Sequence, residues 1–170
     1  MALLIDGYNV LHAAGLLGRR LGPGGLERAR GALLSFLASS LTPEEAARTV
    51  VVFDAGASAP RDRPRSEILH GIQVHYAEPG EEADDLLERL IAADSAPKQL
   101  TVVSGDHRLQ RAAKRRKATA LASDVWFDAL KRRRNLPPRS IAGPRPAKPT
   151  EPLGPEEVEQ WLQEFGLDAE

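Results

Sequence analysis

Short apolar runs, each followed closely by an aspartate, recur along the chain. The runs and their aspartates are Ala2–Ile5 with Asp6, Val50–Phe53 with Asp54, and Leu100–Val103 with Asp106. An apolar run of this length is typical of a strand that is buried on both faces of a parallel sheet. Because functional groups collect beyond the carboxyl ends of parallel strands, we expect these aspartates to share one edge of the sheet.

Apolar residues at helical spacing separate these strands. The periodicity predicts helices from Leu26 to Leu37 and from Glu81 to Ile91. The segment Thr42–Glu45 is typical of a capping box with a proline in the first turn, which predicts a short helix. The alternation of strands and helices predicts an α/β domain whose mostly parallel sheet is covered by helices on both faces.

Two weaker strand patterns complete the expected sheet. Apolar and polar residues alternate over Ile72–Tyr76, which predicts a strand near a sheet edge with His75 exposed on it. The segment Ala118–Ala122 is expected to form the last strand, and Ser123 to cap the helix that follows. The Gly-, Pro- and Arg-rich segment Ala55–Ser66 is expected to be a loop beside the site.

The helix from Glu81 to Ile91 carries two adjacent aspartates that we expect to differ in role. At about 100° per residue, Asp84 lies at the edge of the apolar stripe and Asp85 on the far side. Asp84 is therefore expected to reach the carboxyl edge of the sheet, and Asp85 to face solvent.

The role of Asn9, which follows the first strand closely, has two interpretations. Asparagine is a common helix cap, so Asn9 could simply begin the helix after that strand. Alternatively, its side chain is a polar group held beside Asp6. The residues alone leave both interpretations open.

Length and composition indicate one domain with a tail. The 170 residues divide into an expected domain at 1–136, a proline-rich linker at 137–155 and a short acidic amphipathic helix at 156–170. The net charge of −1 predicts no particular partner, and the lack of cysteine excludes disulfides and thiolate zinc sites. No signal peptide or membrane-spanning stretch is recognisable, so we expect a cytoplasmic protein with no membrane partner.

Basic residues dominate the segment from Arg108 to Arg134, which follows one of the predicted acidic strand ends. A one-sided basic cluster beside an acidic pocket favours a polyanionic partner such as RNA. The candidate contacts to RNA phosphates are Arg108, Arg111, Lys114, Arg115 and Lys117.

The chemistry of the acidic residues points to a metal ion. Asp6, Asp84 and Asp106 are expected to converge with Asp54 nearby, and clustered carboxylates repel one another unless a cation neutralises them. Ligands that are all oxygen favour Mg²⁺ or Mn²⁺. Such an ion keeps bound waters, one of which can become a nucleophile, and it stabilises charge on a phosphoryl oxygen. Metal-assisted hydrolysis of phosphodiester bonds is the reaction that these residues suit best.

Several short motifs occur together in one order and carry a resemblance to a known family. They are Ile5-Asp6-Gly7-Tyr8-Asn9, Val52-Phe53-Asp54-Ala55, Gly80-Glu81-Glu82-Ala83-Asp84, and Val103-Ser104-Gly105-Asp106 with Gln110. Over Ala2 to Leu130, the chain resembles the YacP-like branch of the NYN ribonucleases, which have a PIN-like fold. The resemblance implies a three-layer α/β/α domain, divalent-metal endoribonuclease activity, and cleavage of mRNA in association with ribosomes.

The resemblance also implies roles for individual residues. Asp6, Asp84 and Asp106 match the family's acidic catalytic and metal-binding positions, Asn9 matches its motif asparagine, and Asp54 a secondary acid. Many NYN proteins carry a further acid two residues beyond the position of Asp106, where this chain has Arg108. The departure favours a site with one metal ion, or one that the substrate completes.

Two other functions are compatible with parts of the pattern. A non-catalytic RNA-binding module could keep the same fold, and metal-dependent cleavage of RNA would separate it from a nuclease. A receiver-type phosphoacceptor domain also uses aspartates at strand ends, but it requires paired acids after the first strand and a lysine after the last. Gly7 follows Asp6, and Ala122-Ser123 follows the last strand, so this second alternative fits poorly.

Overall fold

The computed structural model describes residues 2–18, 22, 24–54, 64–78 and 80–135. The chain divides into two units, Met1–Asn135 and Leu136–Glu170, and the second unit lies outside the described residues. The predicted proline-rich linker and acidic C-terminal helix therefore also lie outside them, as do residues 55–63 of the predicted loop from Ala55 to Ser66.

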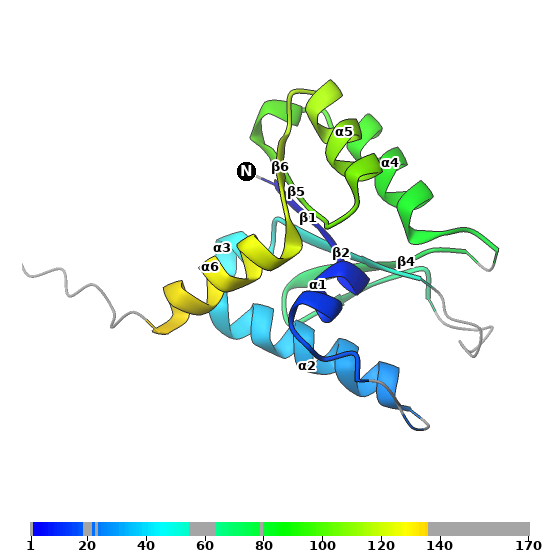
Figure 1. Ribbon diagram of the computed structural model, residues 1–170. Helices are drawn as coiled ribbons and strands as arrows, with labels where there is room; N and C mark the ends of the chain where they lie inside the picture. The colour runs from blue at the N-terminus through cyan, green and yellow to red at the C-terminus, as the bar shows by residue number, and fades with distance from the viewer. Residues whose placement is uncertain (1, 19–21, 23, 55–63, 79, 136–170) are drawn as a thin grey trace, which may run out of the picture. The chain divides into compact units, whose positions relative to one another are not determined.

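A mostly parallel sheet forms the centre of the domain (Figure 1). Its six strands lie in the order β3-β4-β2-β1-β5-β6, and only β3 is antiparallel to its neighbour. The strands are β1 (Ala2–Asp6), β2 (Thr49–Phe53), β3 (Ser66–Leu69), β4 (Ile72–Tyr76), β5 (Leu100–Val103) and β6 (Thr119–Leu121). Strand β1 lies between β2 and β5, so the chain leaves β1 toward one side and later returns to its other side. The carboxyl edge at β1 is therefore where an α/β sheet of this kind places its functional groups.

Helices α1 (Gly7–Ala13), α2 (Gly25–Ser40) and α6 (Ser123–Asn135) cover one face of the sheet. Alternate strand residues such as Ile5, Val51 and Val103 point to this face and are fully buried in its core. Side chains on successive strand residues point to opposite faces, so this set has a period of two. The predicted helix from Leu26 to Leu37 corresponds to α2.

Helices α4 (Ala83–Ala93) and α5 (His107–Arg115) cover the opposite face (Figure 1). The intervening strand residues, among them Leu4, Val52 and Val102, pack against them. The domain thus has three layers, α/β/α, as the sequence predicted. The remaining short helices are α3 (Pro43–Ala46) and the 3-10 helix η1 (Pro97–Gln99). At α3 the predicted capping box is present, since Thr42 and Glu45 bond to each other's backbone N–H groups.

Strand β3 corrects the sequence prediction at one point. Ser66 was expected to end a loop, but it begins β3, which pairs antiparallel with β4 and so becomes the edge strand. The two strands are joined by His70 and Gly71, whose φ angles of 54° and 80° are both positive. A two-residue turn with positive φ matches the twist of the two strands of a hairpin. Gly71, at the second position of this turn, was therefore the sequence signal for a hairpin between β3 and β4.

Ser123 does not cap helix α6, contrary to the sequence prediction. It is the first residue of the helix, it is buried, and its hydroxyl group finds no hydrogen-bond partner among the described residues. The first turn of α6 instead begins with the backbone carbonyl of Ala122, which accepts from the N–H of Trp126 at 3.0 Å. Ser123 therefore lies buried inside the first turn of α6 instead of preceding it as a cap.

Candidate active site

Asp6 is the last residue of β1 and lies beneath the carboxyl edge of the sheet, with only 2% of its surface exposed. It is the cap of helix α1, because its Oδ1 accepts from the backbone N–H of Asn9 at 3.1 Å. Its Oδ2 accepts from the side-chain amide of Asn9 and from the hydroxyl of Ser104, the latter at 2.9 Å. Burial nevertheless outweighs these hydrogen bonds and raises the pKa of Asp6 above its usual range. Of the two interpretations of Asn9, the structure therefore supports the polar partner of Asp6, and Asp6 itself is the cap.

Two glycines allow the segments around Asp6 to approach closely. A Cβ atom at Gly7 would lie 2.2 Å from a ring carbon of Phe53 and 2.8 Å from the carbonyl oxygen of Val52. A Cβ atom at Gly105 would lie 2.6 Å from Oδ1 of Asn9. Both positions therefore need glycine for close packing rather than for an unusual backbone angle.

Asp106 lies just beyond the end of β5 and caps helix α5 by accepting from the N–H of Arg108. Ser104 links this turn to the first strand, because its hydroxyl donates to Asp6 and accepts from the N–H of Asp106 at 3.0 Å. The side chain of Gln110 donates to the carbonyl of Ser104 at 2.9 Å. The strand-to-helix turn after β5 is thus tied to the turn after β1 through one buried serine.

Asp84, the second residue of helix α4, faces the other acids. Its pKa is raised to about 6, first by burial and then by the negative charges of Asp6 and Asp106. A hydrogen bond with Asp106 also favours the protonated form, whereas the positive charge of Arg108 opposes the shift. The structure therefore places Asp84 within electrostatic reach of both Asp6 and Asp106, as expected from the sequence.

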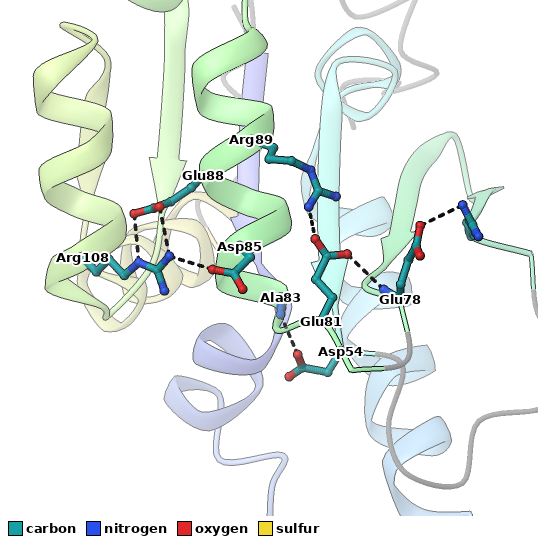
Figure 2. A network of polar contacts seen from close by, with 9 residues as sticks. Asp54, Glu78, Glu81, Ala83, Asp85, Glu88, Arg89 and Arg108 are labelled. Carbon is teal, nitrogen blue, oxygen red and sulfur yellow. Dashed lines mark hydrogen bonds and ion pairs between the residues drawn. The ribbon is translucent and has the colours of Figure 1, made fainter.

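Asp54 directly follows β2 and connects to helix α4 (Figure 2). Its Oδ1 accepts from the backbone N–H of Ala83 at 2.7 Å. Its charge also contributes to the raised pKa of Asp6, so it lies near the other acids.

Asp85 was expected to face solvent, and this is only partly right. Its carboxylate is about half exposed but pairs with Arg108 at 2.7 Å. Arg108 also pairs with Glu88 at 3.0 Å, so one guanidinium from the start of α5 bridges two acids on α4 (Figure 2). Of the predicted RNA-binding residues, Arg108 is therefore already engaged, while Arg111, Lys114, Arg115 and Lys117 are exposed.

The donor set suits a hard divalent cation, although the carboxylates are not arranged around one. Carboxylates and an amide offer only oxygen ligands, and the raised pKa of Asp84 marks a concentration of negative charge that a cation would relieve. Within the described segments, however, no group of three or more His, Asp or Glu side chains stands in position to hold a metal ion. Asp6 accepts one hydrogen bond on Oδ1 and two on Oδ2, so Oδ1 retains acceptor capacity for a cation.

Two residues that matter at this edge were not singled out in the sequence. Ser104 lies inside the motif Val103-Ser104-Gly105-Asp106. Its position directly after the buried strand β5 was the sequence signal that it could link Asp6 to the turn at Asp106. Arg30 lies on α2 and had no signal, because an arginine in an amphipathic helix is normally exposed. In the structure it is only 2% exposed and contacts the backbone of Asp54.

The three-layer fold, with acids gathered at the carboxyl edge beside β1, is that of a nuclease-type, PIN-like domain. A model of the YacP-like NYN domain matches residues 3–162, and the chain belongs to this family. The match extends past the motifs into the predicted linker and tail. Proteins of this family are in general nucleases with an RNA-binding fold. The family match therefore rules against the receiver-type phosphoacceptor domain that the sequence left as an alternative.

Solved structures of Rae1 (YacP) from Bacillus subtilis are similar to this chain. A mutant form shares 25% identity at a TM-score of 0.57, covering 78% of this chain and 77% of that one. A second Rae1 structure shares 21% identity at a TM-score of 0.60, covering 97% of this chain and 81% of that one. At this level of identity, the similarity is evidence for a shared fold only. A comparison with curated proteins gave no match. None of the helices in the described part of the chain is long and apolar enough to cross a membrane.

Proposed function

We propose that this protein is a divalent-metal-dependent endoribonuclease that hydrolyses phosphodiester bonds of RNA. The observation that carries the proposal is the position of three acids at the carboxyl edge of the sheet. Ser104 hydrogen-bonds to both Asp6 and the N–H of Asp106, and Asp84 lies within electrostatic reach of both. Clustered carboxylates cost stability without a cation, so their convergence favours a binding site over a structural role.

In this proposal Asp84 and Asp106 present the accessible carboxylates and Asp6 lies beneath them. Asn9 and Ser104 orient Asp6, each through a hydrogen bond to its Oδ2. A bound Mg²⁺ or Mn²⁺ would supply an activated water and stabilise charge on the phosphoryl oxygen. Because this chain has Arg108 rather than an acid two residues after Asp106, the proposed site holds one metal ion rather than two.

The RNA backbone would run along helix α5. Arg111, Lys114 and Arg115 are exposed on it, and Lys117 follows its end. Phosphate contacts of this kind bind RNA without reading its sequence. The proposal takes mRNA as the substrate, with the ribosome as a partner and the cytoplasm as the location.

The direct test incubates the purified protein with a short labelled RNA in Mg²⁺, in Mn²⁺ or in EDTA. Internal cleavage that needs the metal is the expected result, and adding mRNA with ribosomes tests the preferred substrate. RNA binding without cleavage in either metal would instead favour the non-catalytic RNA-binding module. That alternative has one observation behind it, namely the lack of a preformed metal-binding group among the described residues.

The RNA path is tested with two double variants of equal charge. Arg111→Gln with Lys114→Gln removes two charges from α5, whereas Arg48→Gln with Lys98→Gln removes two exposed charges that precede β2 and β5 at the opposite edge. If two phosphate contacts are lost, the slope of log K against log salt should fall by about 1.4 in the first variant. The second variant should keep the wild-type slope, and equal slopes in both would contradict the proposed path.

A further inference from the structure

Helix α4 begins without a cap of its own. Its capping position is Glu82, whose side chain makes no capping hydrogen bond. The N–H of Ala83, in the first turn, is instead satisfied by Oδ1 of Asp54 at 2.7 Å. This acceptor comes from the end of β2, and it fixes the backbone directly beside Asp84.

Asp54 is itself held by a buried arginine. Nη2 of Arg30 donates to the backbone carbonyl of Asp54 at 2.5 Å. The guanidinium lies among the rings of Tyr8, Phe53 and Tyr76, with its central carbon 5.6, 5.2 and 5.5 Å from their centroids. Contacts with several aromatic faces restrict the guanidinium to one orientation.

Stability alone does not account for this arginine. The guanidinium also donates to the hydroxyl of Tyr8 at 3.1 Å and pairs with Glu27 at 3.1 Å. Its Nε is buried and finds no partner among the described residues. A buried charge with an unpaired N–H is a poor source of stability, and an apolar side chain of similar size would often serve as well. What the arginine does supply is a rigid donor at the end of β2.

We propose that Arg30 and Asp54 are positioning residues for Asp84. Arg30 fixes the backbone of Asp54, the carboxylate of Asp54 fixes the N–H of Ala83, and Asp84 is thereby held against Asp6 and Asp106. Asp54 acts through this acceptor oxygen rather than as a ligand of the metal ion. The inference rests on the proposed function, since it assigns the task for which Asp84 is positioned.

The two roles of Asp54 make opposite predictions for a substitution by asparagine. The amide introduced by Asp54→Asn would keep an oxygen that can accept from the N–H of Ala83, but it would lack the negative charge that a metal ligand needs. This variant should therefore weaken Mn²⁺ affinity only a few-fold, through the loss of a nearby negative charge, whereas Asp54→Ala should weaken it by about a further tenfold, the size typical of groups that orient metal ligands. Equal weakening in both variants would overturn the inference in favour of a ligand.

Glu82→Ala is the matched control. It removes an exposed carboxylate one residue before Ala83 and loses no capping hydrogen bond. Mn²⁺ affinity should stay at the wild-type level in this variant. A loss as large as that of Asp54→Ala would mean that general charge near the helix start, not the Asp54 acceptor, controls the site.

A second readout does not depend on the metal. Hydrogen exchange at the amide of Ala83 should quicken in Asp54→Ala and stay close to wild type in Asp54→Asn, because only the first variant loses the acceptor. Unchanged exchange in Asp54→Ala would overturn the inference. If the wild type binds no Mn²⁺, the proposed function fails, and amide exchange alone decides whether Asp54 positions the start of α4.

Arg30→Met tests the contact between Arg30 and the backbone carbonyl of Asp54. Methionine fills most of the space and packs well against aromatic rings, but it offers no donor to the carbonyl of Asp54. Both readouts should change in the direction of Asp54→Ala, and combining the two substitutions should add little, because they break one chain of contacts. Fully additive effects would show that Arg30 and Asp54 act separately and would overturn the link between them.

Discussion

Helices α1 and α5 begin differently from helix α4, although each brings an acidic side chain to the same edge of the sheet. Asp6 and Asp106 are themselves caps, and each accepts an N–H two or three positions further along its own helix. Asp84 is the second residue of α4 and does not occupy its capping position. The start of α4 is held by Asp54 from β2 on one side and by Arg108 from α5 on the other (Figure 2).

The difference shows two ways of placing an acid in a site. A strand that ends in Asp and turns directly into a helix positions the carboxylate locally, because a side-chain oxygen one residue before a helix satisfies free N–H groups. An acid within a helix has no such local restraint, so contacts from distant parts of the chain must determine its position. Asp84 is also the acid whose pKa is raised to about 6, which marks the crowding that those contacts maintain.

The largest effect is expected from Asp106→Asn. Asparagine caps helices as well as aspartate does, so helix α5 and the melting temperature should be unchanged. Cleavage of RNA should fall by about a thousandfold, because in the proposed function this substitution removes a charged ligand of a metal ion that contributes several kcal/mol to the reaction.

Asp106→Ala should lose cleavage to the same extent. Because it also removes the cap of helix α5, it should lower the free energy of unfolding by about 1 kcal/mol. Measuring activity and thermal unfolding of both variants separates the two roles of this aspartate. Retained cleavage in Asp106→Asn would show that capping is its only role.

The second effect compares the neighbours on α4. Asp84→Asn should reduce cleavage by about a hundredfold, because it changes the acid that faces Asp6 and Asp106. Asp85→Asn removes one contact of Arg108, which keeps its pair with Glu88. Asp85→Asn should therefore reduce the rate of cleavage only a few-fold, as expected for the loss of a half-exposed ion pair. Rates measured at saturating metal provide the test, and similar losses in the two variants would contradict the assignment of Asp84 to the site.

A smaller effect is expected from Gly105→Ala. The new methyl group would push the amide of Asn9, whose Oδ1 lies 2.6 Å from its position, and so disturb the contact between Asn9 and Asp6. Cleavage should fall by about tenfold while the protein stays folded.

Gly31→Ala is the control for this substitution. It adds the same methyl group within helix α2, where nothing lies within 4 Å, and it should stabilise the protein by up to about 1 kcal/mol without affecting cleavage. If Gly105→Ala retains full activity, the position of Asn9 does not matter for the reaction.

The smallest effect concerns helix α3, whose start combines a local cap with a distant contact. Glu45 closes the capping box and also pairs with Arg133 at 2.6 Å, chiefly through a hydrogen bond that lowers the pKa of Glu45. Arg133→Gln should cost about 0.5 kcal/mol at neutral pH, since both side chains are more than a third exposed.

The pH dependence of that cost follows from the direction of the shift. A lowered pKa contributes stability above the unfolded-state value, and this contribution is lost as the pH falls through the folded-state pKa. Urea unfolding at pH 7 and at pH 3 should show the difference between wild type and Arg133→Gln shrinking in acid. A difference that persists at pH 3 would mean that packing, rather than charge, is responsible.

The elements that were predicted correctly carry strong local patterns. Apolar runs predicted β1, β2 and β5, and helical periodicity predicted α2 and α4. Strand β3 was missed because Ser66–Leu69 is short and only partly buried, with Ile68 exposed, so its sequence has no clear apolar face. Serine is a favoured cap by residue type, but Ser123 lies inside the first turn of α6, buried and with no hydrogen-bond partner for its hydroxyl among the described residues.

The site divides in the same way. The sequence by itself determined that Asp6 and Asp106 stand where strands turn into helices, because strand pattern and capping chemistry are local. It also indicated that Asp84 faces the sheet, through the helical stripe. Only the tertiary structure decided how α4 is fixed in place. Asp54, Arg30 and Arg108 are far from each other or from α4 in the sequence, and a local hydrophobic pattern contains no information about such contacts. Burial of Arg30 among aromatic rings depends on helix α2 meeting helix α1 and strands β2 and β4, and that is a property of the folded chain alone.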